Sequence, residues 1–96
     1  MLHIVNKSPF QNDAFVSCMG HAADSSTVLL IEDGVYAALK GSSVADKLSG
    51  GAKVVALQSD VAARGIESNL ADGVETIDYA GFVDLVEGNE KVQSWL

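Results

Sequence analysis

The sequence predicts a small α/β domain of three layers, in which a four-stranded, mainly parallel sheet lies between helices on both faces. Short apolar segments rich in β-branched residues alternate four times with segments that have helical features. These apolar segments are too hydrophobic to leave one face in water, which is typical of buried parallel strands. Because cores rarely divide in a chain of 96 residues, we expect a single domain over residues 1–96.

The first strand and the first helix are expected near the N-terminus. Leu2–Val5 is a short apolar run that ends at a turn. Ser8 is placed to cap a helix beginning at Pro9, and Gln11 completes a capping-box pattern. At about 100° per residue, the apolar side chains of this helix share one half of its surface, with Cys18 near the middle. We therefore expect Cys18 to face packed side chains.

Two further apolar strands are expected in the middle of the chain. Thr27–Ile31 and Lys53–Leu57 are continuous runs rich in β-branched residues, the pattern of strands covered on both faces. A short helix is expected over residues 35–39. A further helical turn is expected over residues 44–48, before a pair of glycines ends it.

The last third of the chain adds a short helix over Val61–Arg64, capped by Ser59-Asp60, and a weaker strand over Val74–Ile77. Asp78 is expected to cap a final helix. No element is assigned to residues 91–96, which carry the only tryptophan. The apolar side chains of the final helix keep the i, i+3, i+4, i+7 spacing of a core-facing stripe: Tyr79, Phe82, Val83 and Val86.

Composition limits the classes of partner. Thirteen acidic against six basic residues give a net charge of −7, and no cluster of lysine or arginine offsets it, so direct nucleic-acid binding is not expected. No apolar run approaches the ~18 residues of a transmembrane helix. A lone cysteine is typical of a reducing compartment, and we expect a cytoplasmic protein without membrane contact. The open edges of the predicted sheet favour association with other chains.

The turns that follow the strands lack the motifs of common α/β enzymes. They contain no glycine-rich dinucleotide or phosphate loop and no nucleophile elbow. Glu32 and Asp33 lack the further residues of an acidic magnesium pocket, so helix capping by Asp33 is favoured. Cys18 and His21, even with the distant His3, cannot complete a tetrahedral metal site. We expect neither a metal nor an organic cofactor.

Cys18 is the main candidate for chemistry. A lone thiol is a packed apolar residue, an interface residue or a sulfur nucleophile. Its expected place late in a helix, on an apolar arc, opposes formation of a thiolate and favours the packed interpretation. His21, one turn further on, would partly offset this if it were protonated. His3, in the first strand, is expected to be a core or interface residue rather than a general base.

Several segments, in order across the chain, resemble the DsrH/TusB family of sulfur-relay subunits. The likeness is nearest to DsrH of the DsrEFH complex, a branch that carries a cysteine in the first helix, where this chain has Cys18. The matching stretches are Leu2–Phe10, Leu29–Ala38, Ala63–Gly65, Ile77–Leu85 and Val92–Leu96.

The resemblance implies a DsrE-like fold and a place in a DsrEFH/TusBCD-like complex. Such a subunit assembles with DsrE/TusD-like and DsrF/TusC-like chains into a heterohexamer, which passes persulfide sulfur to a DsrC/TusE-like acceptor. The sulfur ends in tRNA wobble uridine 2-thiolation or in sulfur oxidation. No cofactor is implied, because attack of a thiolate on a persulfide sulfur needs none. In isolation, such a chain could instead form a homo-oligomer.

Two interpretations stay open on the sequence. In the first, the chain is at most a sulfurtransferase subunit that carries sulfur as a persulfide on Cys18, with His21 tuning the thiol. In the second, it is a non-catalytic structural subunit that shapes the hetero-oligomer and the surface where the acceptor docks, and Cys18 is only packed. The resemblance places the principal persulfide cysteine in the DsrE/TusD subunit, which is compatible with either. A free-standing ligand-binding domain is a third option.

Overall fold

Five parallel strands form the sheet at the centre of the fold. The computed structural model describes residues 1–23, 25–42, 44, 48 and 51–95. The strands follow the order β4-β3-β2-β1-β5, and every neighbouring pair is parallel. Their bounds are Leu2–Val5 (β1), Thr27–Leu30 (β2), Lys53–Leu57 (β3), Glu75–Ile77 (β4) and Val92–Trp95 (β5).

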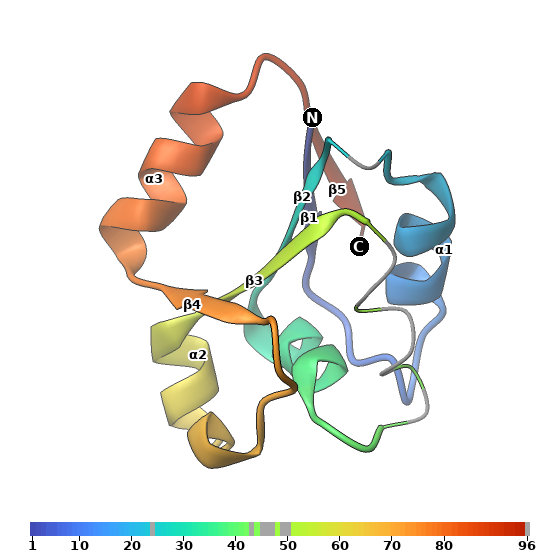
Figure 1. Ribbon diagram of the computed structural model, residues 1–96, viewed down its shortest axis with the longest axis vertical. Helices are drawn as coiled ribbons and strands as arrows, with labels where there is room; N and C mark the ends of the chain where they lie inside the picture. Colours follow the sequence, from blue (N-terminus) through green and yellow to red (C-terminus); the bar gives the residue numbers. More distant parts are fainter. Residues whose placement is uncertain (24, 43, 45–47, 49–50, 96) are drawn as a thin grey trace.

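Helices lie on both sides of this sheet (Figure 1). The helix α1 (Ala14–His21) covers one face, and α3 (Tyr79–Gly88) lies against the other. Three shorter helices complete the described part of the chain: η1 (Glu32–Ala38), α2 (Gln58–Ala63) and η3 (Glu67–Asn69). The predicted α/β class, with a parallel sheet between helices, is confirmed. Among the described residues, no helix is long and apolar enough to cross a membrane.

The sheet has one strand more than the four predicted. Residues 92–95, to which the sequence assigned no element, form β5 and pair in parallel with β1, so that Trp95 lies opposite Val5. This strand lies at the edge of the sheet and is mostly exposed. Its sequence, Val-Gln-Ser-Trp, therefore lacks the apolar run by which the buried strands were recognised.

The first helix begins at Ala14 and not at Pro9 as predicted. Ser8 does act as a local acceptor, but its Oγ accepts from the backbone N–H of Phe10, two residues on, at 3.2 Å. The Asn12 side chain likewise accepts from the N–H of Ala14 at 2.7 Å. Such short-range bonds compete with the helical pattern and hold residues 8–12 in turns. The expected capping box is thus wrong, and Phe10 is exposed instead of lying on the apolar arc.

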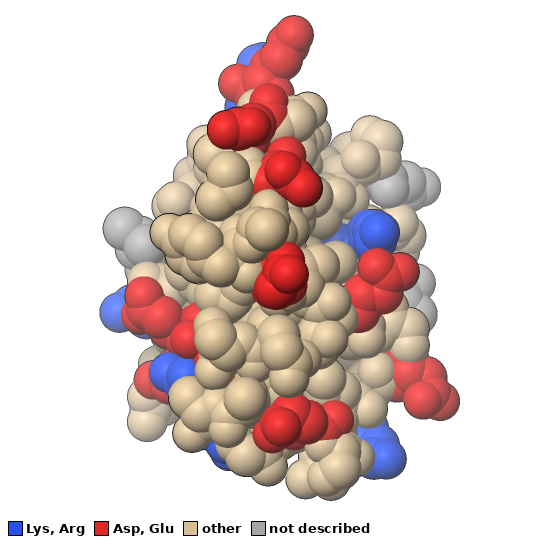
Figure 2. All heavy atoms as spheres, turned by 90° about the vertical axis from the view of Figure 1, so that its left-hand side faces the viewer, with Lys and Arg blue, Asp and Glu red and all other residues tan. Residues whose placement is uncertain are grey.

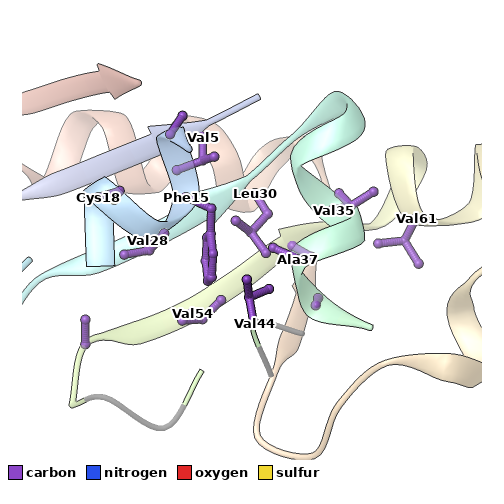
Figure 3. Close-up of a cluster of buried hydrophobic side chains, with 14 of the residues drawn as sticks. Val5, Phe15, Cys18, Val28, Leu30, Val35, Ala37, Val44, Val54 and Val61 are labelled. Carbon is purple, nitrogen blue, oxygen red and sulfur yellow. The ribbon is translucent and has the colours of Figure 1, made fainter. Parts of the chain in front are cut away.

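Successive residues of the strands point to opposite faces and build two apolar clusters. The larger cluster lies on the α1 side, where Phe15 packs with strand residues such as Val28 and Leu30 (Figure 3). The smaller one lies on the α3 side and is built around Leu2, Leu29 and Val55. More buried side chains therefore lie beneath α1 than beneath α3.

Asp78 caps α3 as predicted, because its Oδ1 accepts from the N–H of Gly81 at 2.8 Å. Of the four residues of the predicted core-facing stripe, however, only Phe82 packs on the sheet. Phe82 and Leu85 pack on the sheet, whereas Tyr79, Val83 and Val86 are exposed. The apolar positions of this helix cover more than one face, so spacing alone could not select the buried one.

The remaining helical predictions were close in position but not in detail. The helix expected over 35–39 is η1, a 3-10 helix that starts three residues earlier, and the one expected over 61–64 is α2. That helix follows β3 directly, and no side chain caps it, so the capping role given to Ser59 and Asp60 is wrong. The helical turn expected over 44–48 lies mostly outside the described residues.

Candidate functional site: Cys18 and its surroundings

Cys18 lies in the middle of α1 with its side chain turned into the core. Its exposed fraction is zero, and it belongs to the same cluster as Phe15 and Val28 (Figure 3). The expectation that this thiol faces packed side chains is confirmed. A thiol in such surroundings has no open path to a second protein in the conformation that the structure describes.

The surroundings of Cys18 also keep it protonated. Burial raises the pKa of the thiol to about 11. Since the thiolate is the reactive form, only about one molecule in ten thousand is reactive at pH 7. Cys18 is therefore a packed and weakly nucleophilic thiol in this conformation.

His21, the residue expected to tune Cys18, is directed elsewhere. It is exposed at the end of α1, and its Nδ1 lies 2.7 Å from the carbonyl oxygen of Ser17. Because a carbonyl oxygen can only accept, Nδ1 is the protonated nitrogen and donates this bond. The ring packs against Trp95, with 5.6 Å between the ring centres. No hydrogen bond between His21 and Cys18 occurs in the described part of the chain.

His3 also contacts Trp95, with 6.2 Å between the ring centres. Its Nδ1 accepts a hydrogen bond from the indole Nε1 of Trp95 at 3.1 Å, which requires that Nδ1 carry no proton. Burial lowers the pKa of His3, with smaller contributions from the charged N-terminus and from His21. His3 was expected to be a core or interface residue, and the structure buries it within the chain. Both histidines and the only tryptophan thus form one cluster, which sequence reasoning missed because β5 was not recognised.

A second polar cluster lies where β2 and β3 end. The guanidinium of Arg64 binds Asp33 through two nitrogens, at 2.9 and 3.0 Å, and also approaches Asp60 at 3.9 Å. The other carboxylate oxygen of Asp60 accepts from the backbone N–H of Glu32 at 2.7 Å. Asp33 is thus an ion-pair partner and not a helix cap. The sequence could have indicated part of this cluster, because Asp60 and Arg64 are four residues apart, the spacing at which opposite charges meet on a helix.

These contacts hold a backbone that is otherwise unfavourable. Glu32 adopts a φ of +48°, in the left-handed region that side chains other than glycine rarely occupy. Gly34 follows so close to β1 that a Cβ there would lie 2.2 Å from the carbonyl oxygen of Val5. The turn is therefore fixed by its own packing. It does not bring together a nucleophile and a base, and no group of three metal-ligating side chains occurs among the described residues.

An open hollow of about 450 Å³ lies beside this turn. Aromatic and aliphatic side chains from the 8–11 turn and from residues 36–39 line most of it, and Asp33 is the only charged one among the described residues that line it. It therefore offers a shallow apolar surface without the converging polar groups of an enzyme pocket. Its lining is Ser8, Phe10, Gln11, Asp33, Tyr36 and Leu39.

The fold and the buried thiol define a small all-parallel α/β protein without a nucleotide loop. The structure is similar to the crystal structure of the ychN protein from E. coli, with a TM-score of 0.84, 19% identity and 97% of each chain covered. It is also similar to the solution structure of protein Tm0979 from Thermotoga maritima, with a TM-score of 0.70 and 32% identity. That comparison covers 95% of this chain and 97% of the other.

The sequence comparisons are more specific. The family model described as DsrH like protein matches residues 7–92. Protein TusB of Photorhabdus laumondii is 36% identical over 96 residues, which are 99% of this chain and 100% of that protein. Protein TusB of Cronobacter sakazakii is 35% identical and one from Escherichia coli is 32% identical over the same shares. The chain belongs to the DsrH/TusB family, as its sequence indicated.

Proposed function

We propose that this chain, as a single domain over residues 1–96, is a structural subunit of a cytoplasmic TusBCD-like sulfur-relay complex for tRNA wobble uridine thiolation. In this role it shapes the complex and carries no sulfur itself. Membership of the DsrH/TusB family supports the relay, and relatives that bear the name TusB support the branch that ends in tRNA. The observation that carries the structural role is the complete burial of Cys18 together with its raised pKa.

The chemistry of a relay explains why this burial supports a structural role. A thiolate attacks the outer sulfur of a donor persulfide, the donor cysteine leaves as a thiolate, and the receiving cysteine then holds the sulfur. In the described conformation Cys18 is inaccessible to solvent, and burial raises the pKa of its thiol, so both access and ionisation are disfavoured. A persulfide on it would also add one sulfur atom to a packed core, and overpacking of this kind costs about 1–3 kcal/mol. Cys18 is better suited to fill space beneath α1.

The proposed partners are two homologous chains, DsrE/TusD-like and DsrF/TusC-like, and a DsrC/TusE-like acceptor. We propose the two copies of each subunit that the family resemblance implies. Both edges of the sheet, β4 and β5, consist mainly of exposed residues, and β4 is only three residues long. Exposed edges and a modest core are suited to a chain that completes its structure by assembly.

The test is intact-mass spectrometry of the assembled complex after treatment with a persulfide donor. The folded chain is expected to gain no sulfur, whereas the same chain unfolded in denaturant should gain about 32 Da, one sulfur atom, on its thiol. Cys18→Ala should assemble and support transfer to the acceptor at the wild-type rate. A gain of sulfur on the folded chain, together with loss of transfer in an assembled Cys18→Ala complex, would make Cys18 a carrier and contradict the structural role.

A further inference from the structure

The outer side of α3 combines an apolar stripe with a set of acidic side chains. We propose that this surface is a reversible docking site for a small protein that presents an apolar groove bordered by lysine and arginine. The proposal rests on the proposed function, because in a relay complex the protein that must bind and leave is the sulfur acceptor. We call this surface, made of Tyr79, Val83, Val86, Asp84 and Glu87, the α3 ridge.

The apolar part of the α3 ridge is continuous. Tyr79, Val83 and Val86 are spaced i, i+4 and i+7 and lie within about 60° of one another around the helix. All three are exposed, and the fraction for Tyr79 reaches 71%. The other large exposed apolar side chains, such as Phe10 and Val16, lie on separate elements. Single exposed apolar residues are common, whereas a contiguous set marks an interaction surface.

The tyrosine of the α3 ridge is already held in place. Its ring packs against that of Phe82, with 5.6 Å between the ring centres, while Phe82 is anchored on the sheet. A partner would therefore meet an ordered aromatic side chain and lose little conformational entropy on binding it. Tyrosines of this kind are frequent among the residues that dominate binding energy.

Charge around the α3 ridge specifies the partner. Residues 65–90 contain seven of the thirteen acidic residues and no lysine or arginine. In the part of the chain that the structure describes, only Glu75 of these seven has an ion-pair partner. Figure 2 looks onto this side and shows acidic side chains over its middle, with basic ones mainly toward its margins. A second copy of the chain would bring like charges together, so a basic surface is the complement.

The same charges favour a reversible partner over a permanent one. Permanent interfaces are large and poor in charged residues at their centre. Here Glu87 lies one turn from Val83, and Asp84 lies one turn before Glu87, further from the apolar stripe. Exposed carboxylates of this kind speed association and make it sensitive to salt. The helix is also held on the sheet without a partner, through Phe82 and Leu85. A site with these properties can release its ligand without local unfolding.

The test measures binding of the acceptor protein from the same genome to the complex assembled from this chain and its two homologous subunits. Val83→Gln should raise the Kd about tenfold. Val16→Gln is the matched control, since Val16 is a helical valine of nearly equal exposure, 38% against 40%, on the opposite side of the sheet. Asp84→Lys combined with Glu87→Lys should slow association about tenfold at low salt, and this difference should shrink at high salt.

Each other outcome overturns the inference in a distinct way. If Val83→Gln and the charge reversal bind the acceptor as the wild type does, the α3 ridge is not the docking site, and the proposed function stands. If Val83→Gln instead releases the homologous subunits, the α3 ridge is a permanent subunit interface. If the wild-type chain assembles with neither subunit, the proposed function is wrong and this inference is wrong with it.

Discussion

The two sides of the sheet are built very differently. The α1 side buries aromatic, aliphatic and thiol side chains completely, and Phe15 and Cys18 of an eight-residue helix are both inaccessible to solvent. The helix on the other side is longer, with ten residues, yet none of its side chains is fully buried. Helix length therefore does not indicate here which helix stabilises the fold.

The two sides of the sheet therefore have different roles: the α1 side stabilises the fold, and the α3 side offers a surface for binding. The α1 side contains nearly all of the larger cluster, so a change there alters the free energy of unfolding. On the α3 side, the strand residues Leu2, Leu29 and Val55 are buried, but α3 itself rests on half-buried contacts and leaves apolar and acidic groups facing outward. The outward-facing residues of α3 can change with little effect on stability, which is the freedom that a binding surface needs. A cysteine on the first side is therefore protected, whereas a tyrosine on the second is available.

The sharpest test of this comparison replaces one phenylalanine on each side. Phe15→Ala should lower the free energy of unfolding by about 3–5 kcal/mol, because it leaves a cavity in a closed cluster. Phe82→Ala should lower it by about 1–2 kcal/mol, because its site is already partly hydrated. Urea unfolding followed by circular dichroism measures both. Equal losses would mean that the two sides support the fold equally, and the comparison would be wrong.

A change in stability of intermediate size is expected when the pH is lowered, because of the histidine–tryptophan cluster on the α1 side. Folding lowers the pKa of His3, so near pH 6 the unfolded chain takes up a proton that the folded chain does not. Stability should therefore be nearly constant between about pH 7 and 8 and should fall as the pH drops below about 6.5. Protonation would also put a hydrogen on Nδ1, where His3 now accepts from Trp95.

This pH dependence can be isolated by substitution. His3→Asn keeps an acceptor near the indole but does not titrate, so the loss of stability between neutral pH and pH 5.5 should be smaller than in the wild type. His21→Asn removes the exposed histidine, and this variant should still lose most of the stability that the wild type loses between neutral pH and pH 5.5. Unfolding midpoints at each pH, followed by fluorescence of Trp95, measure both. A wild-type dependence that persists in His3→Asn would assign it to other groups.

The sequence predicted those parts of the fold that are buried on both sides. The runs at 2–5, 27–31 and 53–57 became β1, β2 and β3, because continuous apolar residues have few alternatives to a covered strand. The strand at 92–95 was missed because an edge strand needs only one neighbour and can be polar. Likewise, Ser8 matched a cap by pattern, but the hydrogen bond of its Oγ to Phe10 closed a turn instead.

The candidate site was predictable only in part. The place of Cys18 on an apolar arc followed from helical periodicity, and its burial confirmed it. The surroundings of His21 could not be predicted from periodicity. Its partner Trp95 lies 74 positions further along the chain and is brought near by β5. Helical spacing identified four apolar residues on α3 but not which would face solvent. That choice depends on the angle at which the helix meets the sheet, a tertiary property.

The smallest change in the free energy of unfolding is expected when an ion pair on the α3 side is removed. Lys53 and Glu75 approach to 3.4 Å across β3 and β4, but their side chains are 59% and 65% exposed. Water and salt screen such a pair, so Glu75→Gln should change the free energy of unfolding by no more than about 0.5 kcal/mol. Urea unfolding at low and high salt measures this. A loss above about 1 kcal/mol would show that β4 depends on this pair, and that the α3 side contributes more to stability than its packing indicates.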